Sequence, residues 1–346
     1  MSNRITIEQV DEPGDAGLSV ADGETILDAA LAAGIPYPHG CQSGNCGACK
    51  SSLLAGAVDL LPYSDYALAA TERAAGLILA CRAMPLSDCR VAWLEADETA
   101  VFPMRSLDCR VVALDDATHD IKRLRLAVDA GGPYDFAAGQ YAQLSFPGLP
   151  QRDYSMANRP DEAVLEFHIR LFPDGAVTPF VARTLAPGDA VHVEGPFGTA
   201  YLRKRHRGPI VALAGGTGLA PVKAIVETAL AKSMTQDIHL YLGVRAERDI
   251  YLEEHFRALA AHHENFRFTV VLSEPDGPTR RRTGFLHQAL AADHDDLDGV
   301  KLYLAGPPPM VEAALEVART RGARRQDCHA DAFYSAAEKQ VLEATS

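Results

Sequence analysis

The sequence predicts a multidomain chain of the α+β and α/β classes: a small N-terminal domain, an antiparallel β-barrel and a doubly wound parallel sheet. The 346 residues are enough for two or three domains. Short strands with frequent turns fill residues 104–205, which is typical of a small barrel. Apolar strands alternate with helices from residue 206 onward, which indicates a parallel sheet. We therefore expect domains at 1–95, 104–205 and 206–346.

The composition disfavours several classes of protein. The formal net charge is −13, whereas nucleic-acid binders are usually basic. The acidic surplus fits either solubility or an acidic docking face for a basic redox partner. No apolar run is long enough to span a membrane, and Met1–Arg4 lead into a strand-like stretch without an apolar signal core. A cytoplasmic monomer is the expectation.

The first domain begins with an amphipathic strand, in which Ile5 and Ile7 alternate with polar neighbours. A helix is predicted over Glu24–Ala33, because Gly34 and Pro36 follow as stop residues. The polar stretch 96–100 is predicted to be a linker.

The remaining strands follow from apolar runs. In the second domain they are predicted at Cys109–Leu114, Ile121–Val128, Gln140–Phe146, Val164–Leu171 and Ala190–Glu194. In the third they are predicted at Ile210–Ala214, Ile238–Leu242, Phe268–Leu272 and Leu302–Leu304, with a helix from Pro221 after the first.

Seven cysteines occur, and three of them lie within nine positions. Cys41, Cys46 and Cys49 form a C-x4-C-x2-C run, and Cys81 follows at a distance, which is the plant-type [2Fe–2S] spacing. The alternative is zinc, which normally needs two C-x2-C pairs, whereas only one is present. Gly40, Gly44 and Gly47 would let the loop wrap closely around the cluster. Cys89, Cys109 and Cys328 are interpreted as small apolar residues.

Several motifs in the second and third domains resemble the ferredoxin–NADP reductase superfamily. They are Arg152-Asp-Tyr154-Ser155, the glycine turn Gly215-Gly-Thr-Gly-Leu-Ala-Pro221, Gly306-Pro307-Pro-Pro-Met310 and the final stretch 329–334. The glycine turn follows a strand and opens a helix, which is the context that a phosphate-binding turn requires.

The resemblance implies roles in FAD binding. Arg152 would pair with the pyrophosphate, Tyr154 would lie against the isoalloxazine, and Ser155 would sit at flavin N5, the hydride acceptor. His168, Ile169 and Arg170 match the strand beside the flavin. Gly175, Val177 and Thr178 match the turn whose N–H groups and hydroxyl hold the pyrophosphate. Taken alone, each of these residues would be an ordinary strand or surface residue.

The same resemblance implies a nicotinamide nucleotide site. The pyrophosphate would dock at Gly216, Thr217 and Gly218, and the nicotinamide beside Gly306 and Pro307. Ala305 replaces the cysteine familiar at this turn, which removes one nicotinamide contact. Phe333 would shield the flavin and move aside for the nucleotide, so Ser155 and Phe333 are the predicted catalytic residues.

NADH is predicted in preference to NADPH. Ser273 and Glu274 lie where NADP-using relatives carry serine and arginine, and Glu274 would repel a 2′-phosphate but accept from a 2′-hydroxyl. The alternative is that one of Arg280–Arg282 reaches a phosphate. Arg245 and Asp249 are expected near the adenine end, although a plain surface role is also open.

The whole chain resembles the reductase components of multicomponent bacterial oxygenases, particularly those of aromatic-ring dioxygenases such as the terephthalate and naphthalene systems. This implies a β-grasp [2Fe–2S] ferredoxin domain, a six-stranded FAD barrel and an NAD-binding domain. Electrons would pass from NADH to FAD, to the cluster, and to a terminal oxygenase or a separate ferredoxin. The alternatives are the same path serving a deoxysugar dehydratase, a non-enzymatic redox sensor or electron carrier, and a flavin oxidase.

Overall fold

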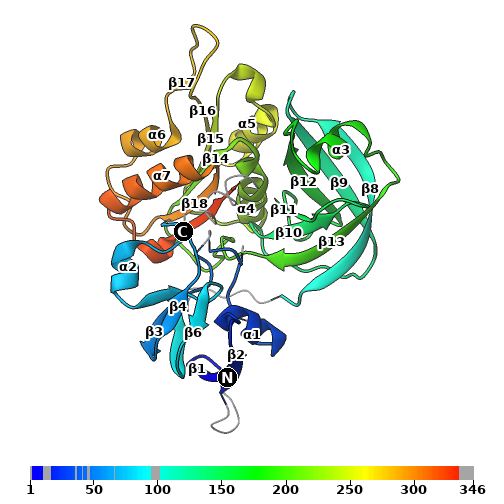
Figure 1. Ribbon diagram of the computed structural model, residues 1–346. Helices are drawn as coiled ribbons and strands as arrows, with labels where there is room; N and C mark the ends of the chain where they lie inside the picture. The colour runs from blue at the N-terminus through cyan, green and yellow to red at the C-terminus, as the bar shows by residue number, and fades with distance from the viewer. Residues whose placement is uncertain are drawn as a thin grey trace. The chain divides into compact units, whose positions relative to one another are not determined.

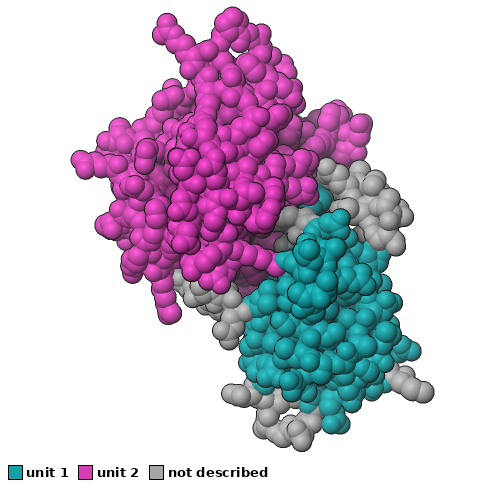
Figure 2. All heavy atoms as spheres, turned by 90° about the vertical axis from the view of Figure 1, so that its left-hand side faces the viewer, with its two compact units in different colours: residues 1–101, 334–346 teal, residues 102–333 magenta. Residues whose placement is uncertain are grey.

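The computed structural model describes residues 2–10, 17–35, 37–40, 42–44, 47–65, 67–94 and 102–334. The chain divides into two compact units, residues 1–101 with 334–346, and residues 102–333 (Figure 2). The predicted linker at 96–100 and the cluster ligands Cys41 and Cys46 lie outside the described residues.

The first unit contains a five-stranded mixed sheet in the order β2-β1-β7-β3-β5, and a two-stranded sheet of β4 and β6. β1 pairs with β2 antiparallel and with β7 parallel. The strands are β1 (Ser2–Ile7), β2 (Leu18–Ala21), β3 (Lys50–Ala55), β4 (Val58–Leu60), β5 (Leu77–Leu79), β6 (Ala83–Pro85) and β7 (Cys89–Trp93), and the helices are α1 (Ile26–Ala32) and α2 (Ala70–Ala74).

Helix α1 occupies the predicted position. The Thr25 hydroxyl accepts from the Asp28 N–H at 3.2 Å and so caps the N-terminus. Ile26, Leu27 and Ala30 are fully buried and belong to the core of this unit. The helix is therefore stabilised by a cap at one end and by an apolar face along its length.

The second unit begins with a six-stranded antiparallel sheet in the order β11-β10-β13-β8-β9-β12 (Figure 1). Its two edges meet at a bridge between Met156, the residue after β11, and Phe167 of β12, so the sheet forms a nearly closed barrel, as predicted. The elements are β8 (Arg105–Asp116), β9 (Ile121–Ala130), β10 (Tyr141–Ser145), β11 (Arg152–Ser155), β12 (Val164–Arg170), α3 (Thr178–Arg183) and β13 (Ala190–Phe197).

A six-stranded parallel sheet completes this unit, in the order β17-β16-β15-β14-β18-β19. Helices α4 and α5 lie on one side of it and α6 and α7 on the other, which confirms the doubly wound prediction (Figure 1). The elements are β14 (Ile210–Gly215), α4 (Leu219–Ala231), β15 (Ile238–Val244), α5 (Glu253–His262), β16 (Phe266–Leu272), β17 (Arg282–Thr283), α6 (Leu286–Asp293), β18 (Lys301–Gly306), α7 (Pro308–Thr320) and β19 (Cys328–Ala332).

The start of helix α4 bears on the site. Helix α4 begins at Leu219, two residues before the predicted start, because a 3₁₀ turn over Gly216–Gly218 leads directly into it.

Among the described residues, none of the helices is both long and apolar enough to cross a membrane.

Candidate functional site

The predicted flavin motif forms an edge strand of the barrel. β11 pairs antiparallel with β10, so its side chains alternate between two faces. Burial raises the pKa of Tyr154 to about 12, although the Arg152 charge opposes this, so the phenol stays protonated and able to donate. The Arg152 guanidinium bonds to the Gln151 carbonyl at 2.8 Å and pairs with no carboxylate in the described part of the chain. A cation without a carboxylate partner beside a partly open barrel fits a phosphate group.

The opening of the barrel lies beside His168, Ile169 and Arg170. Beyond the Met156–Phe167 bridge, β12 pairs only with β9 among the described strands, which leaves one backbone edge for a ligand. The His168 ring itself is buried, with Nδ1 3.0 Å from the Tyr251 hydroxyl and Nε2 3.1 Å from Glu166 Oε1. Any contact between His168 and flavin must therefore come from its backbone.

The turn assigned to the pyrophosphate differs from the expectation at Thr178. Its hydroxyl donates to the Phe172 carbonyl at 2.7 Å and accepts from the Phe172 N–H at 3.0 Å. Gly175 is required here, because a Cβ would lie 2.7 Å from the Thr178 hydroxyl oxygen. The hydroxyl is thus occupied in holding the turn. The N–H groups of residues 176–178 make no hydrogen bond within the described residues and are the groups that fit a phosphate.

The two glycine turns of the parallel sheet pack directly against each other. A Cβ on Gly218 would lie 1.9 Å from the Ala305 carbonyl oxygen, and one on Gly306 would lie 2.9 Å from the Gly215 carbonyl oxygen. Gly216 has a φ of +55°, which favours glycine. The turns after β14 and β18 therefore meet backbone to backbone at the carboxyl edge of the sheet, where α/β sheets bind nucleotides.

A cavity of about 240 Å³ opens at this edge. Six predicted residues line it: Arg170, Gly216, Arg245, Asp249, Ser273 and Pro307. The predicted residues Thr217, Gly218, Glu274 and Gly306 do not line it. Sequence reasoning missed Asp120, Phe285 and Met310, which also line the cavity. Only Met310 carried a sequence signal, since it closes the Gly306–Met310 motif.

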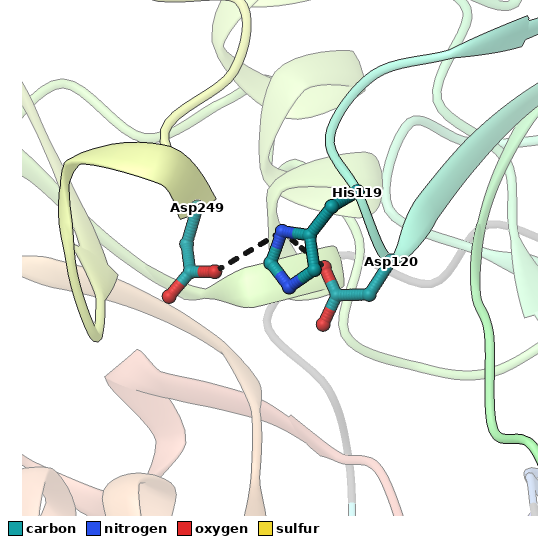
Figure 3. Close-up of side chains that lie close together, drawn as sticks. All are labelled: His119, Asp120 and Asp249. Carbon is teal, nitrogen blue, oxygen red and sulfur yellow. Dashed lines mark ion pairs between the residues drawn. The ribbon is translucent and has the colours of Figure 1, made fainter.

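The mouth of the cavity carries a cluster of charges. Asp120 Oδ2 lies 3.4 Å from Arg170 Nη2 and 3.3 Å from Arg245 Nη2. Asp249 pairs with Arg245 at 3.2 Å, and His119 Nδ1 lies within 3.9 Å of both aspartates (Figure 3). Burial opposes the charge of Arg245, but its bond to Asp249 and the charge of Asp120 together raise its pKa. Arg170, predicted beside the flavin, thus faces the nucleotide cavity.

The arginine run 280–282 separates into different environments. Arg281 pairs with Glu247 at 2.8 Å and with Glu253 at 2.7 Å, and Arg282 pairs with Asp293. Arg280 is exposed and pairs with no carboxylate in the described residues. Two of the three cations are thus already matched by carboxylates and are poor candidates for a phosphate contact.

The flavin motif and the final strand meet at Ser155. Its hydroxyl donates to Asp331 Oδ2 over 3.4 Å, a long bond between β11 and β19. Asp331 is aligned with Ala305, and the Phe333 N–H donates to the Gly306 carbonyl at 2.9 Å. The structure therefore brings the two predicted catalytic residues to the same edge of the sheet as the second glycine turn, and adds Asp331, which sequence reasoning missed.

A buried polar network joins the barrel to the nucleotide turn. The Tyr251 hydroxyl lies 3.3 Å from the Gly216 carbonyl as well as contacting His168. Lys223 of α4 donates to the Ala157 carbonyl at 3.0 Å and pairs with Glu166 at 3.6 Å. Burial and the charges of Lys223 and Arg123 lower the pKa of His168, while Glu166 opposes them. The network fixes β12 relative to the first glycine turn.

The described part of the cysteine loop fits an iron–sulfur cluster. Cys49 and Cys81 are buried, and the Cys81 N–H donates to Cys49 Sγ over 3.5 Å. Gly44 has a φ of +76° and Gly47 one of +70°, so the chain curls as expected. Buried thiols that accept backbone N–H bonds are what a cluster requires of its ligands.

The other three cysteines are thiols without a disulfide partner. Burial raises the pKa of Cys109 to about 12, that of Cys328 to about 11, and that of Cys89 above its ordinary value. Cys89 and Cys109 lie within apolar cores, as interpreted from the sequence, whereas Cys328 is partly exposed.

Three protein families match successive parts of the chain. Residues 10–86 match the 2Fe-2S iron-sulfur cluster binding domain, residues 108–201 the oxidoreductase FAD-binding domain, and residues 212–316 the oxidoreductase NAD-binding domain. The predicted fold and the predicted cofactors, a [2Fe–2S] cluster, FAD and NAD, are confirmed by these matches.

Several curated proteins are similar over nearly the whole chain. Identity is 42% to the ferredoxin–NAD(P)+ reductase component of the naphthalene 1,2-dioxygenase/salicylate 5-hydroxylase systems of a Ralstonia species, covering 95% of this chain and 99% of that protein. It is 36% to the corresponding component of the naphthalene 1,2-dioxygenase system of Pseudomonas putida, covering 95% and 99%. It is 37% to the reductase component of a Pseudomonas phenol 2-monooxygenase, covering 98% and 96%.

Solved structures agree with these similarities. The Amycolatopsis cytochrome P450 reductase GcoB has 36% identity and a TM-score of 0.77, with 96% of this chain and 98% of that chain covered. The ferredoxin reductase of carbazole 1,9a-dioxygenase has 29% identity and a TM-score of 0.68, with 96% and 99% covered.

Proposed function

This chain belongs to the family of ferredoxin–NAD(P)+ reductase components of oxygenase systems, and from that premise we propose that it transfers electrons from NADH to the oxygenase, or to the ferredoxin, of an aromatic-ring dioxygenase system. When bound, FAD supplies the hydride acceptor and the [2Fe–2S] cluster a one-electron exit. The protein's own contribution is binding, orientation and electrostatics.

One observation carries the proposal: the flavin motif and the nucleotide turns occupy one compact unit and meet at Ser155, Asp331 and Phe333. The Ser155 hydroxyl is held by Asp331, and the Phe333 backbone is held by Gly306. Phe333 follows the last residue of β19 and is only partly buried against the core of the parallel-sheet part. Its side chain would therefore move aside for the nucleotide without unfolding β19. A donor and an acceptor of hydride brought to this edge would therefore lie face to face.

The assignment of residues to FAD rests on the opening of the barrel. Arg152 would neutralise the pyrophosphate together with the N–H groups of residues 176–178. Tyr154 would donate its phenolic proton, and Ser155 would orient the reactive edge. Gly175, Val177 and Thr178 shape the turn, and the backbone of His168, Ile169 and Arg170 would border the flavin.

The residues assigned to NADH either line the cavity or lie within two residues, along the chain, of one that does. Gly216, Thr217 and Gly218 would receive the pyrophosphate, and Gly306 and Pro307 would border the nicotinamide. The groups Arg245, Asp249, Ser273 and Glu274 would surround the adenosine ribose. For the cluster, the proposed ligands are Cys41, Cys46, Cys49 and Cys81.

A monooxygenase as the electron acceptor is the second candidate, because the reductase of a phenol 2-monooxygenase has 37% identity to this chain. The expectations of a monomer and of a cytoplasmic location stay predictions, which light scattering and cell fractionation would test. The deoxysugar dehydratase route stays open as an alternative acceptor.

The test is anaerobic mixing of the iron-replete protein with NADH or NADPH, followed by rapid-scan visible spectra and low-temperature EPR. We expect flavin bleaching and then the EPR signal of a reduced [2Fe–2S] cluster, much faster with NADH. Bleaching without a cluster signal would contradict the electron path, and faster reduction by NADPH would contradict the nucleotide preference. Adding purified dioxygenase, ferredoxin or phenol monooxygenase components would then identify the acceptor.

A further inference from the structure

Asp120 is held rigidly in the turn between β8 and β9. Its N–H donates to the Thr118 hydroxyl at 3.3 Å, and its Oδ1 accepts from the same hydroxyl at 2.9 Å. Its carbonyl accepts from the Leu171 N–H at 2.8 Å. With backbone and carboxylate both fixed, Oδ2 is directed to the mouth of the cavity, where it lies between Arg170 and Arg245.

The charges that line this cavity cancel. Two arginines, Arg170 and Arg245, face two aspartates, Asp120 and Asp249, so their formal sum is zero. A dinucleotide brings a negatively charged pyrophosphate, and a 2′-phosphate adds further negative charge. A cavity whose charges sum to zero tolerates the pyrophosphate alone more readily than the pyrophosphate together with a 2′-phosphate. Each added phosphate must compete with a carboxylate for the same guanidinium groups.

Arg245 is the cation next to the segment expected to read the 2′ position. Its carbonyl accepts from the Glu274 N–H at 2.8 Å, and Glu274 is close enough to contribute to the raised pKa of Arg245. Asp249 holds Arg245 locally and also accepts from the Ala246 N–H at 3.2 Å, so it is needed for the turn. Asp120 comes from another part of the chain, and its carboxylate accepts a hydrogen bond from Arg245 Nη2 at 3.3 Å.

We propose that Asp120 is a specificity-determining residue for the dinucleotide, acting as the counter-ion that prevents Arg170 and Arg245 from accepting a 2′-phosphate. This inference rests on the proposed function, in that it takes the cavity as the NADH site. Discrimination against NADPH would then depend on three carboxylates, Glu274, Asp249 and Asp120, of which Glu274 and Asp249 had a sequence signal and Asp120 had none.

The test compares Asp120→Asn with Asp116→Asn in the FAD-loaded protein. Asp116 lies in β8 just before the same turn, is 70% exposed and pairs with Lys122 at 2.7 Å, and it does not line the cavity, so the control makes the same charge change nearby. Isothermal titration calorimetry measures the dissociation constants of ADP-ribose and 2′-phospho-ADP-ribose, which involve no turnover. The ratio of FAD to protein absorbance is recorded for each variant.

For Asp120→Asn we expect about a fivefold shift of the ratio of the two dissociation constants toward the 2′-phosphate form, with a smaller shift at 0.5 M salt. Asp116→Asn should leave the ratio within about twofold of the unmodified protein. A ratio unchanged in Asp120→Asn would overturn the proposal, as would weaker ADP-ribose binding, which would make Asp120 a direct ribose ligand. Loss of FAD would also overturn it by assigning Asp120 to flavin binding. If the unmodified protein binds neither probe, the assignment of the cavity fails first.

Discussion

The hydroxyl of Tyr251 lies 3.0 Å from Nδ1 of His168, and so joins the strand beside the predicted flavin site to the loop after β15. Both side chains are buried, and burial raises the pKa of Tyr251 well above its ordinary value. Because Glu166 can only accept, neutral His168 carries its proton on Nε2 and accepts from Tyr251 on Nδ1. One phenolic proton is thus shared between His168 and the Gly216 carbonyl.

Replacing Tyr251 with phenylalanine should destabilise the second unit by about 1–3 kcal/mol, because Nδ1 of His168 would be left buried without a donor. Urea unfolding of the FAD-loaded protein measures the change. Tyr134→Phe is the matched control, because within the described residues the hydroxyl of Tyr134 hydrogen-bonds to the Met156 sulfur alone, over 3.6 Å. Its loss should cost about 0.5 kcal/mol. Equal losses in the two variants would argue against the shared proton.

Replacing Glu274 with arginine should move the nucleotide preference toward NADPH by about tenfold in the ratio of kcat/KM values. The exposed carboxylate next to Arg245 would become a second cation beside the 2′ position. Steady-state assays with ferricyanide as electron acceptor provide the measurement. The control Asp276→Arg makes the same charge change two residues farther along the exposed loop. A similar shift in that variant would mean that the changed preference of Glu274→Arg comes from overall charge and not from a contact at the 2′ position.

Sequence reasoning succeeded where one local pattern determines one local structure. The apolar run Ile210–Ala214 with its glycine turn identified β14 and the nucleotide edge, and the Cys41–Cys49 spacing identified the [2Fe–2S] domain. It failed where a residue acts on a distant one. Asp120 sits in an unremarkable polar turn 125 residues before Arg245, and nothing local indicates that the two side chains meet.

Two further features of the site depend on distant contacts in the same way. The Thr178 hydroxyl looked available for a phosphate, but only the folded turn shows that Phe172 occupies it. Arg281 and Arg282 looked like part of one basic run, but their carboxylates come from α5, the turn before it and the end of α6. Hydrogen-bond partners that are remote in sequence decide whether a polar group is free, and motifs do not encode them.

Acidification should destabilise the second unit through His239. Burial and the charge of Arg267 lower its pKa to about 4, while its Nε2 lies 2.9 Å from the Thr269 hydroxyl. Between pH 6.5 and pH 4 the unfolded chain binds a proton that the folded chain refuses, so stability falls as pH falls across this window. His239→Gln should flatten the slope by up to about 1.4 kcal/mol per pH unit in urea unfolding. The control His262→Gln changes a residue at an exposed helix end and should leave the slope unchanged. If the unfolding free energy of His239→Gln followed pH in parallel with that of the unmodified protein, the assignment to His239 would be contradicted.

Alanine at Gly218 should disrupt the nucleotide turn even though the backbone there is ordinary. Gly218 has a φ of −57° and a ψ of −14°, a helical conformation that alanine prefers over glycine. The cost comes only from the neighbouring turn, because the new Cβ would lie 1.9 Å from the Ala305 carbonyl oxygen. We expect a loss of about 3 kcal/mol or more in urea unfolding, together with weaker binding of ADP-ribose. Gly277→Ala, where a Cβ meets no atom within 4 Å, should change neither quantity. Normal ADP-ribose binding by Gly218→Ala would mean that the turns after β14 and β18 can separate without loss of the site.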